Sequence, residues 1–266
     1  MPSSLTDVIP PPVRKALQVG AGLAGLVLVF EALRLLGVLP RASVPSTGEI
    51  VAAVAGSFSS GTMGEALGVT ALAWLLGVLL AAGIGVPVGV MVGLSRWADS
   101  ATGRAVELLR PIPVVALVPL AVVLFGIEVS MQVFLVALAC VWPVLLGSRG
   151  GVRTVDPLQV ETARTFGLGS VASVFRVVLP ASVPAIVTAL RIGASLGVVV
   201  AVGAQLISGS PGLGTLLVTS QNAGRNDIVW ACLLVTGLFG VIVNVLLAAA
   251  ERGIAGWQEL STEGRR

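Results

Sequence analysis

The 266-residue chain has no histidine and no tyrosine, and Lys15 is its only lysine. Without histidine it can form no histidine-ligated metal site and can do no imidazole acid–base chemistry. A phosphate-binding P-loop needs a lysine that follows a glycine-rich loop and precedes Ser or Thr, whereas Lys15 lies between Arg14 and Ala16. The chain therefore cannot hydrolyse ATP through a P-loop of its own, and no catalytic residue is expected in it.

Charge is also scarce along this chain. Only 11% of the residues are charged, whereas 56% are hydrophobic and the mean hydropathy is +1.01. An ordinary soluble domain carries about 25% charged residues, and a chain with so few could not cover a water-exposed surface. Cys140 and Cys232 lie inside apolar runs and suggest neither a metal site nor a disulfide framework. The composition predicts an all-α integral membrane protein without a metal or cofactor of its own.

Long apolar runs set the expected number of membrane crossings. A helix needs about 20 mostly apolar residues to cross a hydrocarbon core of roughly 30 Å. Six runs meet the requirement, at about residues 16–39, 66–94, 108–127, 129–148, 182–207 and 228–250. The first run carries Glu31 and Arg34, whose i,i+3 spacing lets them pair on one helix face. The third run contains Pro113 and Pro119, which predict a kinked or broken helix.

The basic residues indicate the orientation of these spans. With residues 1–15 in the cytoplasm, the external loops hold only Arg41 and Arg225, which is a strong positive-inside asymmetry. A transmembrane domain over residues 16–257 with cytoplasmic tails at 1–15 and 258–266 is therefore expected. A cleaved signal peptide is the competing interpretation of the N-terminus, but the apolar run is long for one and no small-residue cleavage site follows it. The cytoplasmic segments hold 12 of the 16 basic residues: Arg14, Lys15, Arg96, Arg104, Arg110, Arg149, Arg153, Arg164, Arg176, Arg252, Arg265 and Arg266.

One cytoplasmic connection, residues 150–181, is longer than the others and carries helix signals. Asp156-Pro157 predicts an N-cap and a first helical residue, and Gly167 predicts the end of this short helix. Ser170 is expected to cap a second helix that Leu179-Pro180 ends. The apolar positions of the second helix share one face: Val171, Val174, Phe175 and Val178. A short capped helix held outside the bilayer predicts a docking element for a cytoplasmic partner.

The spacing within this connection resembles the EAA loop of ABC-transporter permeases. The family pattern is Glu-Ala-Ala, three residues, Gly, nine residues and Ile-x-Leu-Pro. Here Glu161-Thr162-Ala163, Gly167 and Val177-Val178-Leu179-Pro180 stand at this spacing, with Thr162 and Val177 as the departures. The resemblance covers about Val44 to Trp257. Further segments are similar to the sulfonate/nitrate/taurine branch: Gly93–Trp97, Leu109–Pro113, Phe125–Ile127, Gly151–Pro157, Ala189–Arg191, Gly212–Gly214 and Gln221–Asp227.

This resemblance implies a multi-pass permease of a type I importer in the bacterial inner membrane, with six transmembrane helices. A second copy of the chain would complete the pathway, two separate ATPase subunits would bind ATP and Mg²⁺, and an external solute-binding protein would deliver the cargo. No nucleic-acid partner is expected. Glu161 would orient the helix or contact the ATPase, Ala163 would permit close approach, and Gly167 would permit the turn. The implied ATPase-coupling residues are Pro157, Glu161, Thr162, Ala163, Gly167, Leu179 and Pro180.

Polar residues within the spans are candidates for the pathway. A membrane-embedded arginine such as Arg191 costs on the order of 2.5–3.5 kcal/mol, so it either faces the cargo or pairs with a carboxylate or snorkels, and the second interpretation is favoured. Gln205 stands where relatives often carry Glu, and either suits an anion or serves packing. Ser195 completes the candidates within the spans. Other polar or small residues predict interhelical hydrogen bonds or close packing: Gln132, Trp142, Asn244, Gly77, Gly83, Gly85 and Gly89.

The external loop 208–227 is the expected outer gate. It begins with the turn Ser210-Pro211-Gly212 and continues with an apolar stretch from Leu213 to Val218. Gln221 and Asn222 are its gate candidates, and by the resemblance it contributes to docking of the solute-binding protein. The alternative is a re-entrant lid without a partner.

The expected function is alternating-access import of a small anionic solute, driven by the partner ATPases. Sulfonates or taurine come first as cargo, nitrate or bicarbonate next, and a pyrimidine-type vitamin precursor is an alternative for the same fold. An ion-gradient-driven secondary transporter is the rival of another class, and a membrane scaffold without transport is a second rival. The gradient-driven rival predicts carboxylates or histidines on a proton path, and only Glu31 lies within the predicted spans.

Overall fold

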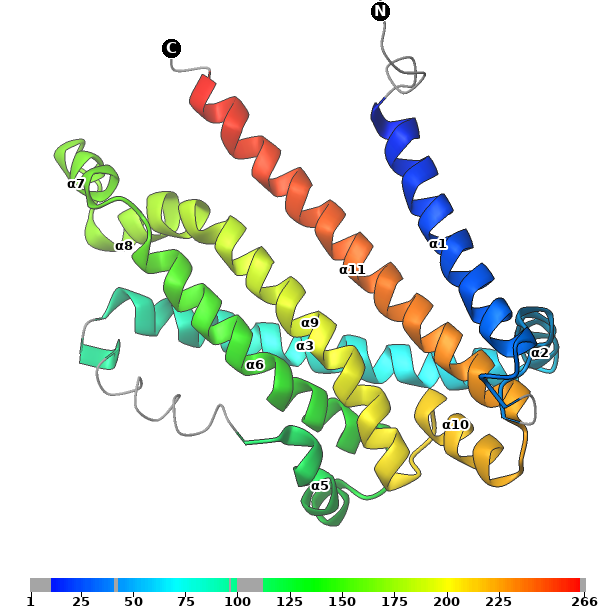
Figure 1. The fold of residues 1–266 in the computed structure, drawn as a ribbon. Coiled ribbons are helices and arrows are strands. Elements are labelled where there is room, and N and C mark those ends of the chain that lie inside the picture. The colour runs from blue at the N-terminus through cyan, green and yellow to red at the C-terminus, as the bar shows by residue number, and fades with distance from the viewer. Residues whose placement is uncertain (1–10, 41–42, 96, 100–111, 264–266) are drawn as a thin grey trace, which may run out of the picture.

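The computed structural model describes residues 11–40, 43–95, 97–99 and 112–263, and this part of the chain is helical without a strand (Figure 1). The expected all-α class is confirmed. The ends of both predicted tails and the start of the third predicted span lie outside the described residues. In chain order the elements are α1 (Pro11–Leu35), α2 (Thr47–Ser59), α3 (Thr62–Leu94), the 3₁₀ turn η2 (Val114–Leu117), α5 (Val118–Phe125), α6 (Val129–Arg153), α7 (Pro157–Thr165), α8 (Ser170–Ser173), the π-helical turn η3 (Val174–Val178), α9 (Leu179–Ser208), α10 (Leu213–Asn222) and α11 (Asn226–Glu263).

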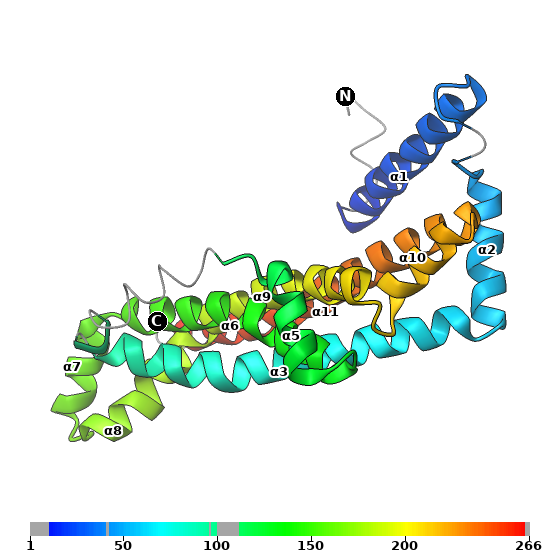
Figure 2. The same ribbon diagram turned by 90° about the horizontal axis from the view of Figure 1, so that it is seen from below.

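Three long helices form the centre of the molecule. α3 packs along α6, α6 packs along α9, and α11 lies against α9. Figures 1 and 2 place α7 and α8 at one end of this bundle and α2 and α10 at the other. The loop expected to dock an ATPase and the loop expected to form the outer gate therefore lie at opposite ends of the bundle.

Glycines in α3 allow its close contact with α6. A Cβ added at Gly77 would lie 2.6 Å from Cβ of Val136, one at Gly85 would lie 3.0 Å from Cγ1 of Val144, and one at Gly89 would lie 2.8 Å from Cβ of Ser148. The prediction of close packing is therefore confirmed at these three glycines. At Gly83 nothing described lies within 4 Å of the added Cβ, so this glycine makes no close contact with α6. Small residues at intervals of four or eight let the two backbones approach.

Replacing Gly89 with valine is expected to destabilise the protein strongly, because the added side chain would meet the carbonyl oxygen of Leu145 as well as Ser148. Overpacking of this kind costs about 3 kcal/mol. Gly83→Val is the matched control, since it changes helix propensity equally and enters open space. Thermal unfolding of the detergent-purified variants measures both. Equal melting temperatures for the two variants would show that this close contact is absent.

Four of the described helical segments are long and apolar enough to cross a membrane: α3, α6, the continuous segment Ser170–Ser208, and Asn226–Gly253 of α11. In the described part of the third predicted span, residues 112–127, the helical stretch is Val114–Phe125, which is shorter than a membrane-spanning helix. Its predicted break is confirmed: η2 ends where α5 begins, and Pro119 falls in the first turn of α5, where a missing N–H costs little. The six-span count and the orientation stay predictions.

α1 contacts the remainder of the chain near its C-terminal end. Arg34 pairs with Glu31 at 3.5 Å, as the i,i+3 spacing predicts, and reaches Glu49 of α2 at 3.5 Å. The rings of Phe30 and Trp230 lie 5.6 Å apart between α1 and α11. Figure 1 shows α1 and α11 diverging toward the N-terminal end of α1.

The helix that follows α7 differs from its prediction at both ends. Ser170 is not its cap: Gly169 holds the N-cap position, and its carbonyl accepts from the N–H of Ser173 at 2.9 Å. Leu179-Pro180 does not end it, because the chain stays helical from Ser170 to Ser208. The π-helical turn η3 directly precedes Leu179-Pro180 and shifts the hydrogen-bond register. The helix therefore continues although Pro180 has no N–H to donate.

Candidate functional site

Helix α7 is a short, well-capped helix at one end of the bundle. The carboxylate of Asp156 accepts a hydrogen bond from the N–H of Leu158 at 2.9 Å, and Pro157 occupies the first turn. At the other end Gly167 has φ +83°, a left-handed conformation that favours glycine. This lets the N–H of Leu168 donate to the carbonyl of Ala163 at 3.1 Å, as in a Schellman motif. The predicted start and end of this helix are therefore confirmed.

The outer surface of α7 combines polar and apolar side chains. Glu161 and Thr162 are exposed, as a docking role requires, and Thr162 Oγ1 donates back to the carbonyl of Leu158 at 2.7 Å. Phe166 is 82% exposed and Leu158 is 65% exposed. These two apolar side chains were not among the sequence candidates, although both lie between Pro157 and Gly167, the predicted ends of this helix. On a helix predicted to lie outside the bilayer, large apolar side chains as exposed as these indicate a contact surface.

Ala163 lies on the inner side of α7. It is buried and faces its own chain, so its small side chain lets α7 pack on the segment that follows. The close approach of the ATPase at this residue stays a prediction. Leu179 and Pro180 lie at the start of α9 and are not on the surface of α7.

A cluster of three charged residues lies where α6 ends and the connection 150–181 begins. The carboxylate of Asp99, which follows α3, pairs with both Arg149 and Arg153 in the last turns of α6. Burial raises the pKa of Asp99, but the hydrogen bonds and charges of the two arginines outweigh it, so the pKa lies below its ordinary value of 3.8. The carboxylate therefore stays charged at neutral pH. It ties the segment after α3 to the C-terminal end of α6, and three residues separate that end from α7.

Arg191 is bound to neighbours on α11. Its Nη1 donates to Glu251 Oε2 at 2.8 Å and its Nε donates to Asn244 Oδ1 at 2.9 Å, while Thr188 Oγ1 donates to the other oxygen of Glu251. The favoured interpretation, pairing with a carboxylate, is thus what the structure has. Ser195 shares the adjacent groove of about 550 Å³, and its hydroxyl donates to the carbonyl of Arg191 at 2.9 Å.

Gln205 does not lie in that groove. It is fully buried near the opposite end of α9, where its amide bonds to Thr70 of α3, to Gln132 of α6 and to the N–H of Gly214. The packing interpretation is therefore the one the structure supports, and the interhelical hydrogen bond predicted for Gln132 is confirmed.

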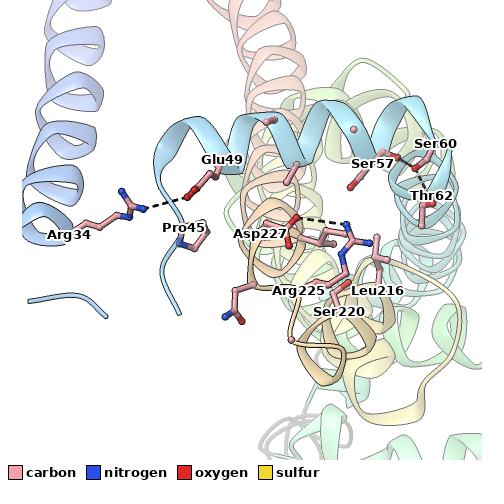
Figure 3. Close-up of a pocket in the computed structure, with 16 residues that line it drawn as sticks. Arg34, Pro45, Glu49, Ser57, Ser60, Thr62, Leu216, Ser220, Arg225 and Asp227 are labelled. Carbon is pink, nitrogen blue, oxygen red and sulfur yellow. Dashed lines mark hydrogen bonds and ion pairs between the residues drawn. The ribbon is translucent and has the colours of Figure 1, made fainter. Parts of the chain in front are cut away.

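Gln221 and Asn222 are exposed at the end of α10, beside an open pocket of about 890 Å³. The pocket lies between α2 and the turn that joins α10 to α11, with Arg34 of α1 at its edge (Figure 3). Its charges are mixed. Arg34 faces Glu49, and Arg225 lies 3.8 Å from Asp227 (Figure 3). The backbone N–H of Ser46 holds the pKa of Glu49 below its ordinary value of 4.5.

The twelve sequence candidates therefore fall in separate places. The motif residues gather on or around α7, Arg191 and Ser195 share a groove, Gln205 is buried, and Gln221 and Asn222 are exposed at the far end. Sequence analysis missed Glu251, since it falls just beyond the last predicted span. An arginine inside the membrane needs a carboxylate partner, so Arg191 was the signal that could have pointed to Glu251.

A helical bundle with four apolar helices of membrane-spanning length is the architecture of a multi-pass membrane protein. The solved structures agree with this class. A chain of an inward-facing methionine ABC transporter superposes with a TM-score of 0.65 at 18% identity and covers 72% of this chain and 95% of its own length. Residues 85–256 match the model of the binding-protein-dependent transport system inner membrane component, and the chain belongs to this family.

Curated relatives agree with this assignment. A putative ABC transporter permease of Methanocaldococcus jannaschii is 34% identical and covers 69% of each chain. A putative aliphatic sulfonates transport permease of Escherichia coli is 29% identical over 88% of this chain and 89% of its own. A taurine transport system permease of the same organism is 30% identical over 75% and 73%. The chain is thus the permease subunit of an ABC importer, a multi-pass protein of the inner membrane.

Proposed function

We propose that the chain forms the pathway for import of a small organic anion, with sulfonates or taurine as the leading cargo. The sulfonate-permease relative, aligned over nearly the whole chain, carries this proposal. ATP and Mg²⁺ are bound by two partner ATPase subunits, consistent with the missing P-loop lysine. The permease itself contributes no catalytic residue.

The ATPase docks on α7 in this proposal. Exposed Phe166 and Leu158 supply apolar area, and Glu161 and Thr162 supply polar contacts beside them. Residues that combine large apolar surface with a polar surround are typical of the energetic centre of an interface. The Asp99 cluster supports transmission, because it ties the segment after α3 to the C-terminal end of α6, where the connection 150–181 begins.

A second copy of the chain completes the pathway. The exposed ridge of α9 offers Ile192 and Leu196, with a groove on either side. One groove, of about 850 Å³, separates α9 from α6 and η2, and the other holds Arg191 and Ser195. Two such ridges that approach one another would leave a passage between the subunits. The solute-binding protein docks at the opposite end from α7, where the pocket of Figure 3 offers both signs of charge.

Uptake of labelled taurine and ethanesulfonate tests the proposed cargo. The chain is produced together with its ATPase and its solute-binding protein in a strain that lacks sulfonate uptake. We expect accumulation that stops when cellular ATP is depleted and continues when an ionophore collapses the ion gradient. The same strain without the binding protein is the control. Uptake that follows the ion gradient would refute the ATP-driven mechanism. If the solute-binding protein binds a pyrimidine and neither of the sulfonates, the proposal of an anionic cargo is refuted.

A further inference from the structure

Four helices meet in a buried polar network around Gln205. Its Nε2 donates to Gln132 Oε1 at 2.9 Å and to Thr70 Oγ1 at 3.1 Å, and its Oε1 accepts from the N–H of Gly214 at 3.0 Å. Thr70 Oγ1 also accepts from the N–H of Leu213 at 3.0 Å. Gln205, Gln132 and Thr70 are each fully buried. The network thus joins α3, α6 and α9 to the first two backbone amides of α10.

The side-chain carboxamide of Gln132 continues the network into the loop before α10. Gln132 Nε2 donates to Ser210 Oγ at 3.0 Å and to the carbonyl of Pro211 at 2.9 Å. The backbone carbonyl of Gln205 accepts from Thr215 Oγ1 at 3.0 Å. Both carboxamides are therefore engaged on the oxygen and on the nitrogen. An amide buried without such partners would cost several kcal/mol, so the loop has one strongly preferred position.

Glycines make this position possible. Gly212 has φ +145°, and a Cβ there would overlap the Gln205 carboxamide. A Cβ at Gly214 would lie 2.8 Å from Cβ of Gln205. The backbone of the loop therefore lies directly on the Gln205 side chain, which leaves no room for α10 to slide over α9.

We propose that Gln205 is a positioning residue that locks α10 and its preceding loop onto the ends of α3, α6 and α9. This corner then moves as one rigid body. The consequence for transport rests on the proposed function: the pathway opens at this end by separation of whole subunits, and α10 does not swing as a hinged lid.

Hydrogen–deuterium exchange tests the lock itself, without any cargo. The permease is purified with its ATPase in lipid nanodiscs. In Gln205→Leu, exchange of peptides over residues 209–217 is expected to be about tenfold or more faster, because the amides of Leu213 and Gly214 lose their fixed partners. Thr70→Val removes one hydroxyl, retains the shape, and is expected to give a smaller increase in the same peptides. Thr236→Val is the control, since this half-buried residue of α11 takes part in none of these bonds. Unchanged exchange in both network variants would overturn the proposal.

Distances between spin labels test the rigid-body movement. Labels are placed at Leu72 of α3 and Thr219 of α10, both exposed, and the native cysteines Cys140 and Cys232 are fully buried. Within one subunit this distance is expected to stay the same with and without a non-hydrolysable ATP analogue, while the distance between the two copies of Thr219 changes. Gln205→Leu should broaden the first distribution. A nucleotide-dependent change within one subunit would overturn the lock. If no distance responds to nucleotide, the proposed ATP-driven function fails, and the exchange measurement still decides on the lock.

Discussion

Replacing Phe166 with alanine is expected to weaken binding of the ATPase subunit by about 30-fold or more, because removal of an interface aromatic at an energetic centre costs about 2 kcal/mol or more. The ring is 82% exposed in the isolated chain, so its loss removes no packing inside the permease. ATP-driven uptake should fall with the binding, while the amount of protein in the membrane stays unchanged. Co-purification of the ATPase with the tagged permease measures the first effect, and cargo accumulation measures the second.

Phe58→Ala is the matched control for this variant. Phe58 is also an exposed phenylalanine, but it lies on α2 at the opposite end of the bundle. It is expected to retain the ATPase at the level of the unmodified chain. If Phe166→Ala retains the ATPase as well, α7 does not provide the main contact, and the docking role of Phe166 is refuted.

The local structure of the coupling loop could be predicted because its signals act over a few residues. Asp156-Pro157 is favourable at the start of a helix and unfavourable inside one. The left-handed backbone conformation at Gly167 favours glycine over residues with a Cβ. The proline at 180 shows the limit of such reasoning. Proline ends a helix only when the hydrogen-bond register is fixed, and the preceding π-helical turn changes that register.

The separation of the pathway candidates could not be predicted, because it depends on contacts between helices. Gln205 and Arg191 are both polar residues of α9, 14 positions apart. Their environments differ because α3, α6 and α10 cover Gln205, whereas α11 lies beside Arg191. A single sequence gives the face of each helix, but it does not give the neighbour that this face meets.

Replacing Arg191 with methionine is expected to lower the melting temperature by about 5 °C, because it leaves the carboxylate of Glu251 beside α9 without its guanidinium. The side chains of this pair are 35% and 22% exposed, which limits the loss relative to a fully buried pair. Asn244 would lose the hydrogen bond from Arg191, whereas Thr188 would keep its hydrogen bonds to Glu251 and to the carbonyl of Pro184. Thermal unfolding of the detergent-purified protein measures the shift. Arg252→Met removes the adjacent arginine of α11 and should change stability little, since its Nε bonds only within its own helix turn.

The double variant Arg191→Met with Glu251→Met separates a structural role of Arg191 from contact with cargo. Removing both charges leaves no unpaired ion, and replacing an ion pair in a low-dielectric setting by apolar residues is often neutral. The melting temperature is therefore expected to return close to that of the unmodified chain, and ATP-driven uptake should recover with it. A double variant that is stable but still inactive would show instead that Arg191 acts on the cargo. That outcome would move the anion-recognising step from the solute-binding protein into the groove that Arg191 shares with Ser195.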